Sequence, residues 1–309
     1  MSSLTNFQFT TVVTVSPTCG TPKGLEESLY EICLVQDASG SFLDDAPNLV
    51  ATDEVIYNEV TSAVLGARFG VAAFIDYAGF GGSLGDFPYR LYSSMSSSLD
   101  DWTNGVESIE IMGGSDGPES QYDGIVGAAE GLSNDFVDQP DCGWSDDFTT
   151  NRVMIVTTDA SFHVPSDGTP YENDFDSTVA VLNRERIRVI GLKAPGASDE
   201  LDALAAATDG VVLPLTSDGS NIAEAILGGL TSLGCTVVPL SDGCEPLTVS
   251  FDPASASVDP GGSVSITTTI SLPEGDRSSL IGTTIECDII FTANGEVRST
   301  RPVSILIGA

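Results

Sequence analysis

Basic residues are scarce in this sequence of 309 residues, in which 11 Lys and Arg stand against 45 Asp and Glu, a formal net charge of -34. Lys23 and Lys193 are the only lysines, and no basic stretch exists. Binding to nucleic-acid phosphates or to an anionic membrane surface depends on such residues, so we expect neither partner. A surface this acidic fits salt-rich surroundings, a protein that binds several divalent ions, or a simple need for solubility.

Long apolar runs and nucleotide-binding loops are also missing. No apolar run reaches the length that spans a bilayer, and residues 1–6 do not resemble the start of a signal peptide. We therefore expect no membrane insertion in this chain, and an export signal that lies outside it. No Gly-x-Gly-x-x-Gly or Walker loop follows an apolar run, which argues against a nucleotide ligand.

The sequence contains a single histidine, His163. A Ser-His-Asp triad or a catalytic zinc centre with several histidines is therefore not expected, and we predict that the chain is not an enzyme. A metal-dependent hydrolase, with Glu119 or Asp159 as the general base, is the least favoured alternative. His163 itself is more typical of loop packing than of metal ligation.

Six cysteines are present, none of them in a Cys-x-x-Cys pair, so a zinc ribbon is not expected. They are enough for three disulfides, which would indicate an oxidising compartment, extracellular or at the cell surface. Cys19, Cys235 and Cys244 lie near an expected domain junction, so a bridge among them is consistent with the sequence. Cys33 lies in an apolar run, where it is either paired or a buried free thiol.

Apolar runs alternate with amphipathic segments between residues 29 and 233. This order predicts a doubly wound, mostly parallel sheet with helices on both faces, whose ligand sites lie at the carboxyl ends of the strands. The predicted strands are residues 30–36, 68–75, 90–94, 152–158, 187–193 and 210–215. The predicted helices are residues 50–65, 120–132, 176–186, 199–207 and 221–233.

The two ends of the chain show a different pattern, in which apolar and polar residues alternate with a period of two. This pattern, interrupted by Gly- and Pro-containing turns, predicts the strands of an Ig-like β-sandwich at residues 7–15, 247–251, 263–272, 283–292 and 297–307. The economical arrangement is a sandwich made of residues 1–22 and 237–309, with an α/β domain of residues 23–236 inserted. The alternative is a separate N-terminal extension.

Oxygen-bearing side chains follow the predicted strands. The first strand ends in Asp37, Ser39 and Ser41, spaced as Asp-x-Ser-x-Ser. Further carboxylates at the same edge, or in loops beside it, come from Asp44, Asp45, Asp76, Asp116, Glu119 and Asp159. So many converging carboxylates repel one another unless a cation is bound, and carboxylate and hydroxyl oxygens suit Mg2+ or Mn2+.

Residues 37–45 resemble the metal-site loop of the von Willebrand factor A fold in its integrin β-subunit form, of which the pair Asp44-Asp45 is characteristic. Residues 69–76, 116–125, 157–168 and 217–221 are similar to later segments of the same family, in the same order. The resemblance covers residues 29–233 and suggests a microbial relative of the integrin βI-like domain. The flanking sandwich is similar in placement to the integrin hybrid domain.

The resemblance implies three metal ions in a row. The central ion, Mg2+ or Mn2+, would be held by Ser39, Ser41 and Glu119, with Asp37 and Asp159 acting mostly through bound waters. One coordination position would remain open for a carboxylate of a partner protein. A neighbouring Ca2+ would be held by Asp44, Asp45 and the backbone carbonyls of Ser41 and Ser217. A third site, also for Ca2+, would use Asp76, Asp116 and Glu119 with the backbone carbonyls of Asp116 and Pro118.

Two departures from the family affect these expectations. Gly114 stands where the family usually has Asn, so the third site is expected to be weak, completed by water, or empty. The loop at residues 77–89 is short and lacks the disulfide of animal integrins, which argues against an integrin-like α subunit as partner.

The resemblance implies a cation-dependent cell-adhesion or protein-recognition module. The alternative is a metal-stabilised structural segment of a large extracellular protein with no ligand of its own. The helix at residues 221–233 leads to the sandwich, and in the family such a helix transmits a conformational change. The sequence leaves two alternatives there, a conformational switch and a rigid junction.

Overall fold

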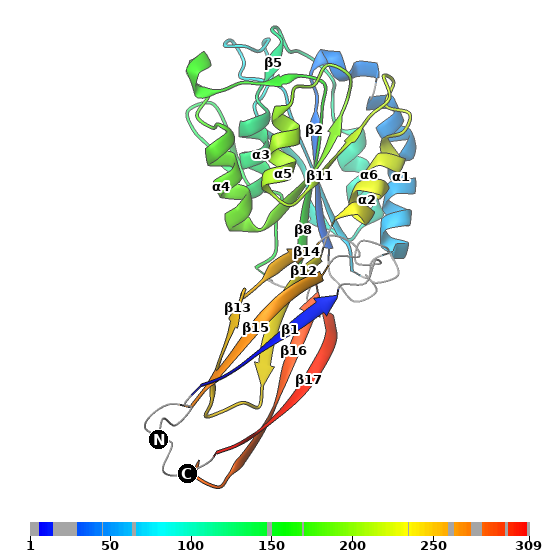
Figure 1. Cartoon of the computed structure of the whole chain (residues 1–309). Coiled ribbons are helices and arrows are strands. Elements are labelled where there is room, and N and C mark those ends of the chain that lie inside the picture. The colour runs from blue at the N-terminus through cyan, green and yellow to red at the C-terminus, as the bar shows by residue number, and fades with distance from the viewer. Residues whose placement is uncertain are drawn as a thin grey trace. The chain divides into compact units, whose positions relative to one another are not determined.

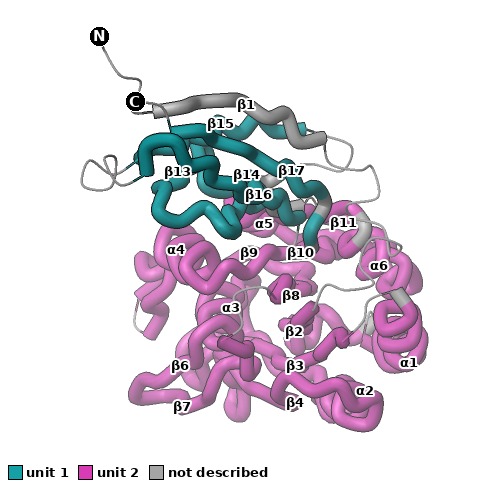
Figure 2. The backbone as a smooth tube through the Cα atoms, turned by 90° about the horizontal axis from the view of Figure 1, so that it is seen from below, with its two compact units in different colours: residues 1–24, 234–309 teal, residues 25–233 magenta. Residues whose placement is uncertain are grey.

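A computed structural model describes residues 6–14, 30–44, 46–63, 66–146, 150–168, 170–233, 235–258, 263–272, 280–293 and 296–307. For residues 6–14, 44, 63, 231, 235, 236, 257, 296 and 298 it describes the backbone alone. The chain divides into two compact units, shown in different colours in Figure 2. One unit consists of residues 1–24 and 234–309, and the other of residues 25–233, so the first contains both ends of the chain.

The unit of residues 25–233 is built around a six-stranded sheet in the order β11-β10-β8-β2-β3-β4. Neighbouring strands are parallel except β3 and β4, which are antiparallel, so the predicted mostly parallel sheet is confirmed. The strands are β2 (Tyr30–Asp37), β3 (Arg68–Phe74), β4 (Arg90–Ser96), β8 (Asn151–Thr158), β10 (Ile187–Lys193) and β11 (Val211–Pro214). All residues of β2 are buried, because β2 is an inner strand of the sheet.

Helices cover both faces of this sheet (Figure 1). Ile32 and Leu34 of β2 belong to an apolar cluster with α1, α2 and α6, whereas Cys33 and Val35 belong to a second cluster with α3, α4 and α5. This alternation follows from the period of two along a strand. The helices are α1 (Ala46–Ala63), α2 (Leu99–Glu107), α3 (Gln121–Glu130), α4 (Phe175–Glu185), α5 (Glu200–Ala207) and α6 (Ile222–Ser232).

Helix α2 was not among the predicted helices, and α1 begins at Ala46, earlier than expected. The serine-rich run before α2 hides a helix start, since Ser98 caps the helix by accepting a hydrogen bond from the backbone N–H of Asp101 at 3.2 Å. Gly105 further weakens the helical pattern, but it has a packing role. A Cβ at this position would lie 2.9 Å from the Cβ of Ser93 in β4, so glycine lets α2 lie close to the sheet.

The unit of residues 1–24 and 234–309 contains two antiparallel sheets, of order β1-β15-β13 and β14-β12-β16-β17. Residues of both sheets, including Ile266 and Ile289, contribute to one apolar cluster. β1 pairs with β15 along its whole length, so the N-terminal strand belongs to a sheet formed by the C-terminal segment. The strands are β1 (Asn6–Thr14), β12 (Cys235–Asp242), β13 (Thr248–Asp252), β14 (Ala256–Val258), β15 (Ser263–Ser271), β16 (Thr284–Ala293) and β17 (Glu296–Leu306).

Two disulfides lie within the described residues. One joins Cys33 of β2 to Cys142, so Cys33 is paired and not a free thiol. The other joins Cys244 to Cys287, so a bridge from Cys244 to Cys19 or Cys235 is wrong, and a bridge between Cys19 and Cys235 stays a prediction. The reason is the β12–β16 pairing, which sets Asp242 opposite Asp288 and brings the segment after β12 beside β16. Cys19 and the side chain of Cys235 lie outside the described residues.

The disulfides are consistent with an oxidising, extracellular compartment. Among the helices that the structure describes, none combines the length and the apolar character that a membrane span requires. Two further pairs of short strands, β5 (Pro118–Glu119) with β9 (Ser161–Phe162) and β6 (Leu132–Ser133) with β7 (Asp138–Gln139), lie in the unit of residues 25–233. The first of these pairs shapes the site described below.

Replacing Leu34 by Ala is expected to destabilise the α/β unit by about 2–5 kcal/mol, because the side chain is fully buried and its removal leaves a cavity. Leu84→Ala is the matched control, since the same substitution on a fully exposed side chain changes stability by less than about 0.5 kcal/mol. Urea unfolding followed by tryptophan fluorescence measures this unit alone, because both tryptophans, Trp102 and Trp144, lie in it. Equal stability losses in the two variants would contradict the described core.

Candidate metal centre

Three neighbouring strands of the parallel sheet end at one edge, and each end carries a carboxylate. Asp37 is the last residue of β2, Asp159 follows β8 directly, and Asp76 follows β3 after one intervening residue. β2 lies between β8 and β3, with parallel pairing on both sides. The sheet therefore brings together carboxylates that are far apart in the sequence.

The hydroxyl groups of Ser39 and Ser41 connect two of these strand ends. The two Oγ atoms lie 3.0 Å apart, and the Ser41 hydroxyl donates a hydrogen bond to Oδ1 of Asp159 at 2.9 Å. Asp37 is fully buried; its Oδ1 accepts from the backbone N–H of Ser39 at 2.9 Å and its Oδ2 from the Thr158 hydroxyl at 2.7 Å. These contacts fix Asp37 beneath the two serines.

Glu119 is placed beside this group by its backbone. β5 pairs in parallel with β9, and the backbone carbonyl of Glu119 accepts a hydrogen bond from the N–H of His163 at 2.8 Å. The next residue, Ser120, donates from its backbone N–H and its hydroxyl to the carbonyl of Ile75, each at 2.9 Å. The Glu119 side chain is buried, and its Oε2 has no hydrogen-bond partner in the part of the chain that the structure describes.

Gly114 explains how the Glu119 carboxylate fits close to Ser39. A Cβ at position 114 would lie 2.4 Å from Oε1 of Glu119 and 3.3 Å from the Cβ of Ser39. Gly114 also has a φ of +65°, a left-handed conformation that favours glycine. The glycine that departs from the integrin pattern therefore makes room for the carboxylate, and any side chain here would collide with it.

The electrostatic state of the group reflects its crowding. Burial, together with the charges of Asp37, Asp76, Asp116 and Asp86, raises the pKa of Glu119 to about 10. Burial also raises the pKa of Asp37 to about 6, although hydrogen bonds from Ser39 and Thr158 oppose this change. Ionisation is thus disfavoured at both carboxyls, and more strongly at Glu119 than at Asp37, when no cation is present.

The donor atoms suit a hard divalent cation. The hydroxyls of Ser39 and Ser41 contact each other, the Ser41 hydroxyl bonds Asp159, and the carboxylates of Asp37 and Glu119 lie close to Ser39. Oε2 of Glu119 is buried and has no hydrogen bond in the part of the chain that the structure describes. Mg2+ and Mn2+ prefer oxygen ligands of this kind, and they commonly retain water in part of their coordination shell. The arrangement can therefore neutralise its own repulsion by binding such an ion.

The residues expected around the neighbouring Ca2+ are described only in part. Asp45 and the side chain of Asp44 lie outside the described residues. Ser217 is exposed in the loop between β11 and α6. Asn48, near the start of α1, donates a hydrogen bond from its amide to the backbone carbonyl of Asp218 at 2.5 Å. This bond brings the Ser217 loop close to the start of α1.

His163 lies among the residues expected at the third site, and not only in loop packing. Its Nε2 is 3.4 Å from Oδ2 of Asp76 and 3.5 Å from Oδ2 of Asp116, and its Nδ1 is 3.0 Å from Oδ2 of Asp167. Burial alone would lower the pKa of His163, but contacts with Asp76 and Asp167 and the nearby charges raise it to about 9. The ring also stacks on Tyr171, with centroids 4.0 Å apart.

Asp86 is a further residue that the sequence analysis missed. Its Oδ2 accepts hydrogen bonds from the backbone N–H groups of Ser83 and Gly114, at 2.5 and 3.0 Å. It thereby holds the glycine turn that leads to Glu119. No spacing pattern connects Asp86 to Gly114, so only its position after Asp76 in the same loop could have drawn attention to it.

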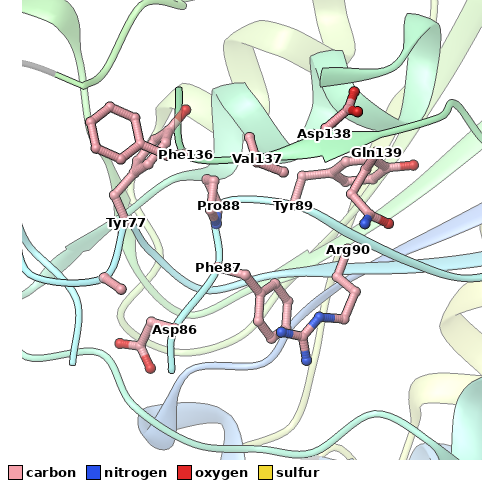
Figure 3. A pocket seen from close by; sticks show the side chains of 11 residues that line it. Tyr77, Asp86, Phe87, Pro88, Tyr89, Arg90, Phe136, Val137, Asp138 and Gln139 are labelled. Atoms are coloured by element: carbon pink, nitrogen blue, oxygen red, sulfur yellow. The ribbon is translucent and has the colours of Figure 1, made fainter. Parts of the chain in front are cut away.

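Asp86 also lines a pocket of about 320 Å³ (Figure 3). Its other walls include aromatic side chains and one cation, Arg90, whose guanidinium lies 3.8 Å from the centroid of the Phe87 ring. Phe80 and Phe136, which are about half exposed, form an edge-to-face pair nearby, with centroids 5.1 Å apart. The loop at residues 77–89 thus contributes exposed apolar surface.

Comparison with known proteins gives one weak similarity to report. The chain matches no protein-family model. It is 23% identical over 156 residues to human integrin beta-4, a match that covers 46% of this chain and 8% of that protein. The similarity suggests an integrin-like relationship and, because the chain spans so little of the relative, carries no conclusion about the relative's whole activity.

Stability of the metal-free protein is expected to fall as the pH rises from about 5 to about 9. Glu119 and Asp37 have raised pKa values when folded, so the folded state binds more protons than the unfolded state in this range and loses stability as they ionise. The raised pKa of His163 acts in the same direction, because its stabilising charge is lost as the pH approaches about 9.

Thermal unfolding at pH of about 5 and about 9 measures this loss of stability. Each measurement is made after chelation of metal and again with excess Mg2+. Mg2+ should restore much of the stability lost at the higher pH, and Glu119→Gln should show a smaller loss than the wild type. A metal-free protein that gains stability between pH 5 and pH 9 would contradict the crowding described here.

Proposed function

We propose that this chain is a divalent-cation-dependent adhesion or protein-recognition module, and that its partner supplies a carboxylate to the central ion. The observation that carries the proposal is the convergence of two serine hydroxyls with three carboxylates at one edge of the sheet, including a buried Glu119 oxygen that has no hydrogen bond among the described residues. Ser39, Ser41 and Glu119 would hold Mg2+ or Mn2+, with Asp37 and Asp159 acting through water.

Exposure differs across the group in a way that suits an open coordination position. Asp37, Ser39 and Glu119 are buried, whereas Ser41 is exposed and Asp159 is partly exposed. Protein ligands would therefore reach the ion from the interior, and water or a partner would reach it from the solvent side. Serine ligands matter here, because a shell made of carboxylates alone would neutralise the ion too fully to attract another anion.

The family assignment belongs to the same proposal. We infer an integrin βI-like domain of the von Willebrand factor A fold, inserted in an Ig-like, hybrid-like sandwich and exposed outside the cell. Supporting observations are the motif order in the sequence, the weak match to integrin beta-4, the sheet with helices on both faces, and the two disulfides. Ca2+ at the flanking position near Asp44 and Asp45 is part of the same proposal.

Recognition is favoured over catalysis by the position of the only histidine. His163 directs its ring nitrogens toward Asp76, Asp116 and Asp167, and it stacks on Tyr171. The ring of His163 is thus surrounded by carboxylates. The Ser41 hydroxyl donates its hydrogen bond to Asp159 and not to a histidine that could act as its base. The alternative to recognition is a metal-stabilised structural segment with no partner, which would need protein groups to complete the coordination shell.

Selection from a random peptide library in Mg2+, with elution by a chelator, tests the proposal without a known partner. The recovered peptides are expected to share an Asp or Glu, and replacing it by Asn or Gln should weaken binding about tenfold or more, which corresponds to about 1.4 kcal/mol. Ser41→Ala should lose this binding, since it removes a ligand of the ion. Ser94→Ala, at an exposed serine of edge strand β4, is the matched control and should bind as the wild type does.

Binding that survives the chelator, or peptides without a required acidic residue, would contradict recognition through a metal-bound carboxylate. A Ser41→Ala variant that keeps the same peptides and the same Mg2+ dependence would do so as well. Metal-dependent stability without any selected peptide would favour the structural alternative.

A further inference from the structure

We propose that Asp76, Asp116 and His163 form a site for a zinc-type transition-metal ion, in place of the calcium site expected there from the integrin resemblance. This inference goes beyond the proposed recognition function and does not depend on the central ion. The three residues come from different segments: Asp76 follows β3, Asp116 precedes β5 and His163 follows β9. One potential ligand atom from each lies within 4.8 Å of the other two.

Two of the three ligand atoms are buried and have no hydrogen bond in the described part of the chain. Asp76 is 0% exposed and His163 6% exposed, and Oδ2 of Asp76 and Nε2 of His163 both lack a hydrogen-bond partner. Nε2 lies 3.4 Å from Oδ2 of Asp76 and 3.5 Å from Oδ2 of Asp116. Two ligand atoms on a tetrahedral zinc ion, each about 2.1 Å from the metal, are about 3.4 Å apart. The two distances from Nε2 therefore fit an ion shared with either carboxylate, and the ligand atoms of all three side chains lie within 4.8 Å of one another.

Neighbouring groups orient both buried side chains toward this common point. Oδ1 of Asp76 accepts hydrogen bonds from the hydroxyl of Tyr171 and the backbone N–H of Tyr77, each at 2.7 Å, which leaves Oδ2 available. Nδ1 of His163 is 3.0 Å from Oδ2 of Asp167, which leaves Nε2 available. A carboxylate that holds one imidazole nitrogen while the other faces a metal is a common arrangement around bound zinc.

Gly81 lets the backbone lie close to these atoms without a side chain that would displace them. A Cβ at position 81 would lie 2.0 Å from Oδ2 of Asp76 and 2.9 Å from Nε2 of His163. Any side chain at this position would collide with Oδ2 of Asp76 and crowd the His163 ring. The site also has an entrance, because the side chain of Asp116 is 44% exposed. Water can therefore complete the coordination shell from that side.

The ligand atoms decide which metal is preferred. Calcium takes six to eight oxygen ligands, whereas an imidazole nitrogen with two carboxylate oxygens suits Zn2+ and Co2+. The central group offers only oxygen atoms from serine and carboxylate side chains and suits Mg2+ or Mn2+. The two positions at this sheet edge would thus select different ions.

The single histidine allows a direct test on the wild-type full chain. We expect Zn2+ to shift the 15N NMR signal of Nε2, and we expect Ca2+ in large excess neither to cause this shift nor to reverse it. In a titration monitored by visible absorption, one Co2+ should bind with a nitrogen-ligated spectrum and be displaced by Zn2+. An Nε2 signal that does not respond to Zn2+, or a site that Ca2+ empties of Co2+, would overturn the proposal.

Variants separate this site from the central one. His163→Gln should weaken Co2+ binding more than tenfold, and Asp167→Asn, which removes the group that orients the ring, should weaken it about 10- to 100-fold. Ser41→Ala should leave Co2+ binding at His163 unchanged, so this result stands even if peptide recognition fails. Asp138→Asn is a control at another surface carboxylate. Wild-type Co2+ affinity in His163→Gln, confirmed as folded by its tryptophan fluorescence, would also overturn the proposal.

Discussion

Repulsion among buried carboxylates is the constraint on which the functional edge of the α/β unit depends. Asp37 and Asp76 are fully buried, and Glu119 is nearly so. Hydrogen bonds from Ser39 and Thr158 offset part of the cost at Asp37, and contacts with His163 and Tyr171 do the same at Asp76. Glu119 receives no such compensation at its Oε2 within the described residues. A bound cation at this edge removes the largest remaining unfavourable interaction.

The acidic surface gives the same ion a second role in the proposed recognition. A protein with a net charge of -34 repels an anionic partner at long range, and this repulsion is screened only when salt is abundant. A partner carboxylate would therefore be attracted at short range by the metal alone. In this proposal the metal supplies specificity without a basic patch.

The sequence was sufficient to predict the strands and the loop residues whose position depends on the local pattern of apolar and polar residues. The strands of the central sheet are apolar because both faces are covered, and the residues after them must lie at one edge because the strands are parallel. Features set by contacts distant in the sequence were not accessible. Cys33 and Cys142 are separated by 109 positions, and a single histidine has no second ligand at a recognisable spacing. Asp86 acts through the backbone of Gly114, which no side-chain motif records.

Diffraction from crystals containing Mn2+, recorded at a wavelength where manganese scatters anomalously, tests the central claim most directly. We expect an anomalous peak between the hydroxyls of Ser39 and Ser41 and the carboxylate of Glu119, with water on the exposed side near Asp159. Absence of that peak in crystals that bind Mn2+ elsewhere, with Glu119 still buried and unpaired, would contradict the claim that this edge is built to hold a cation.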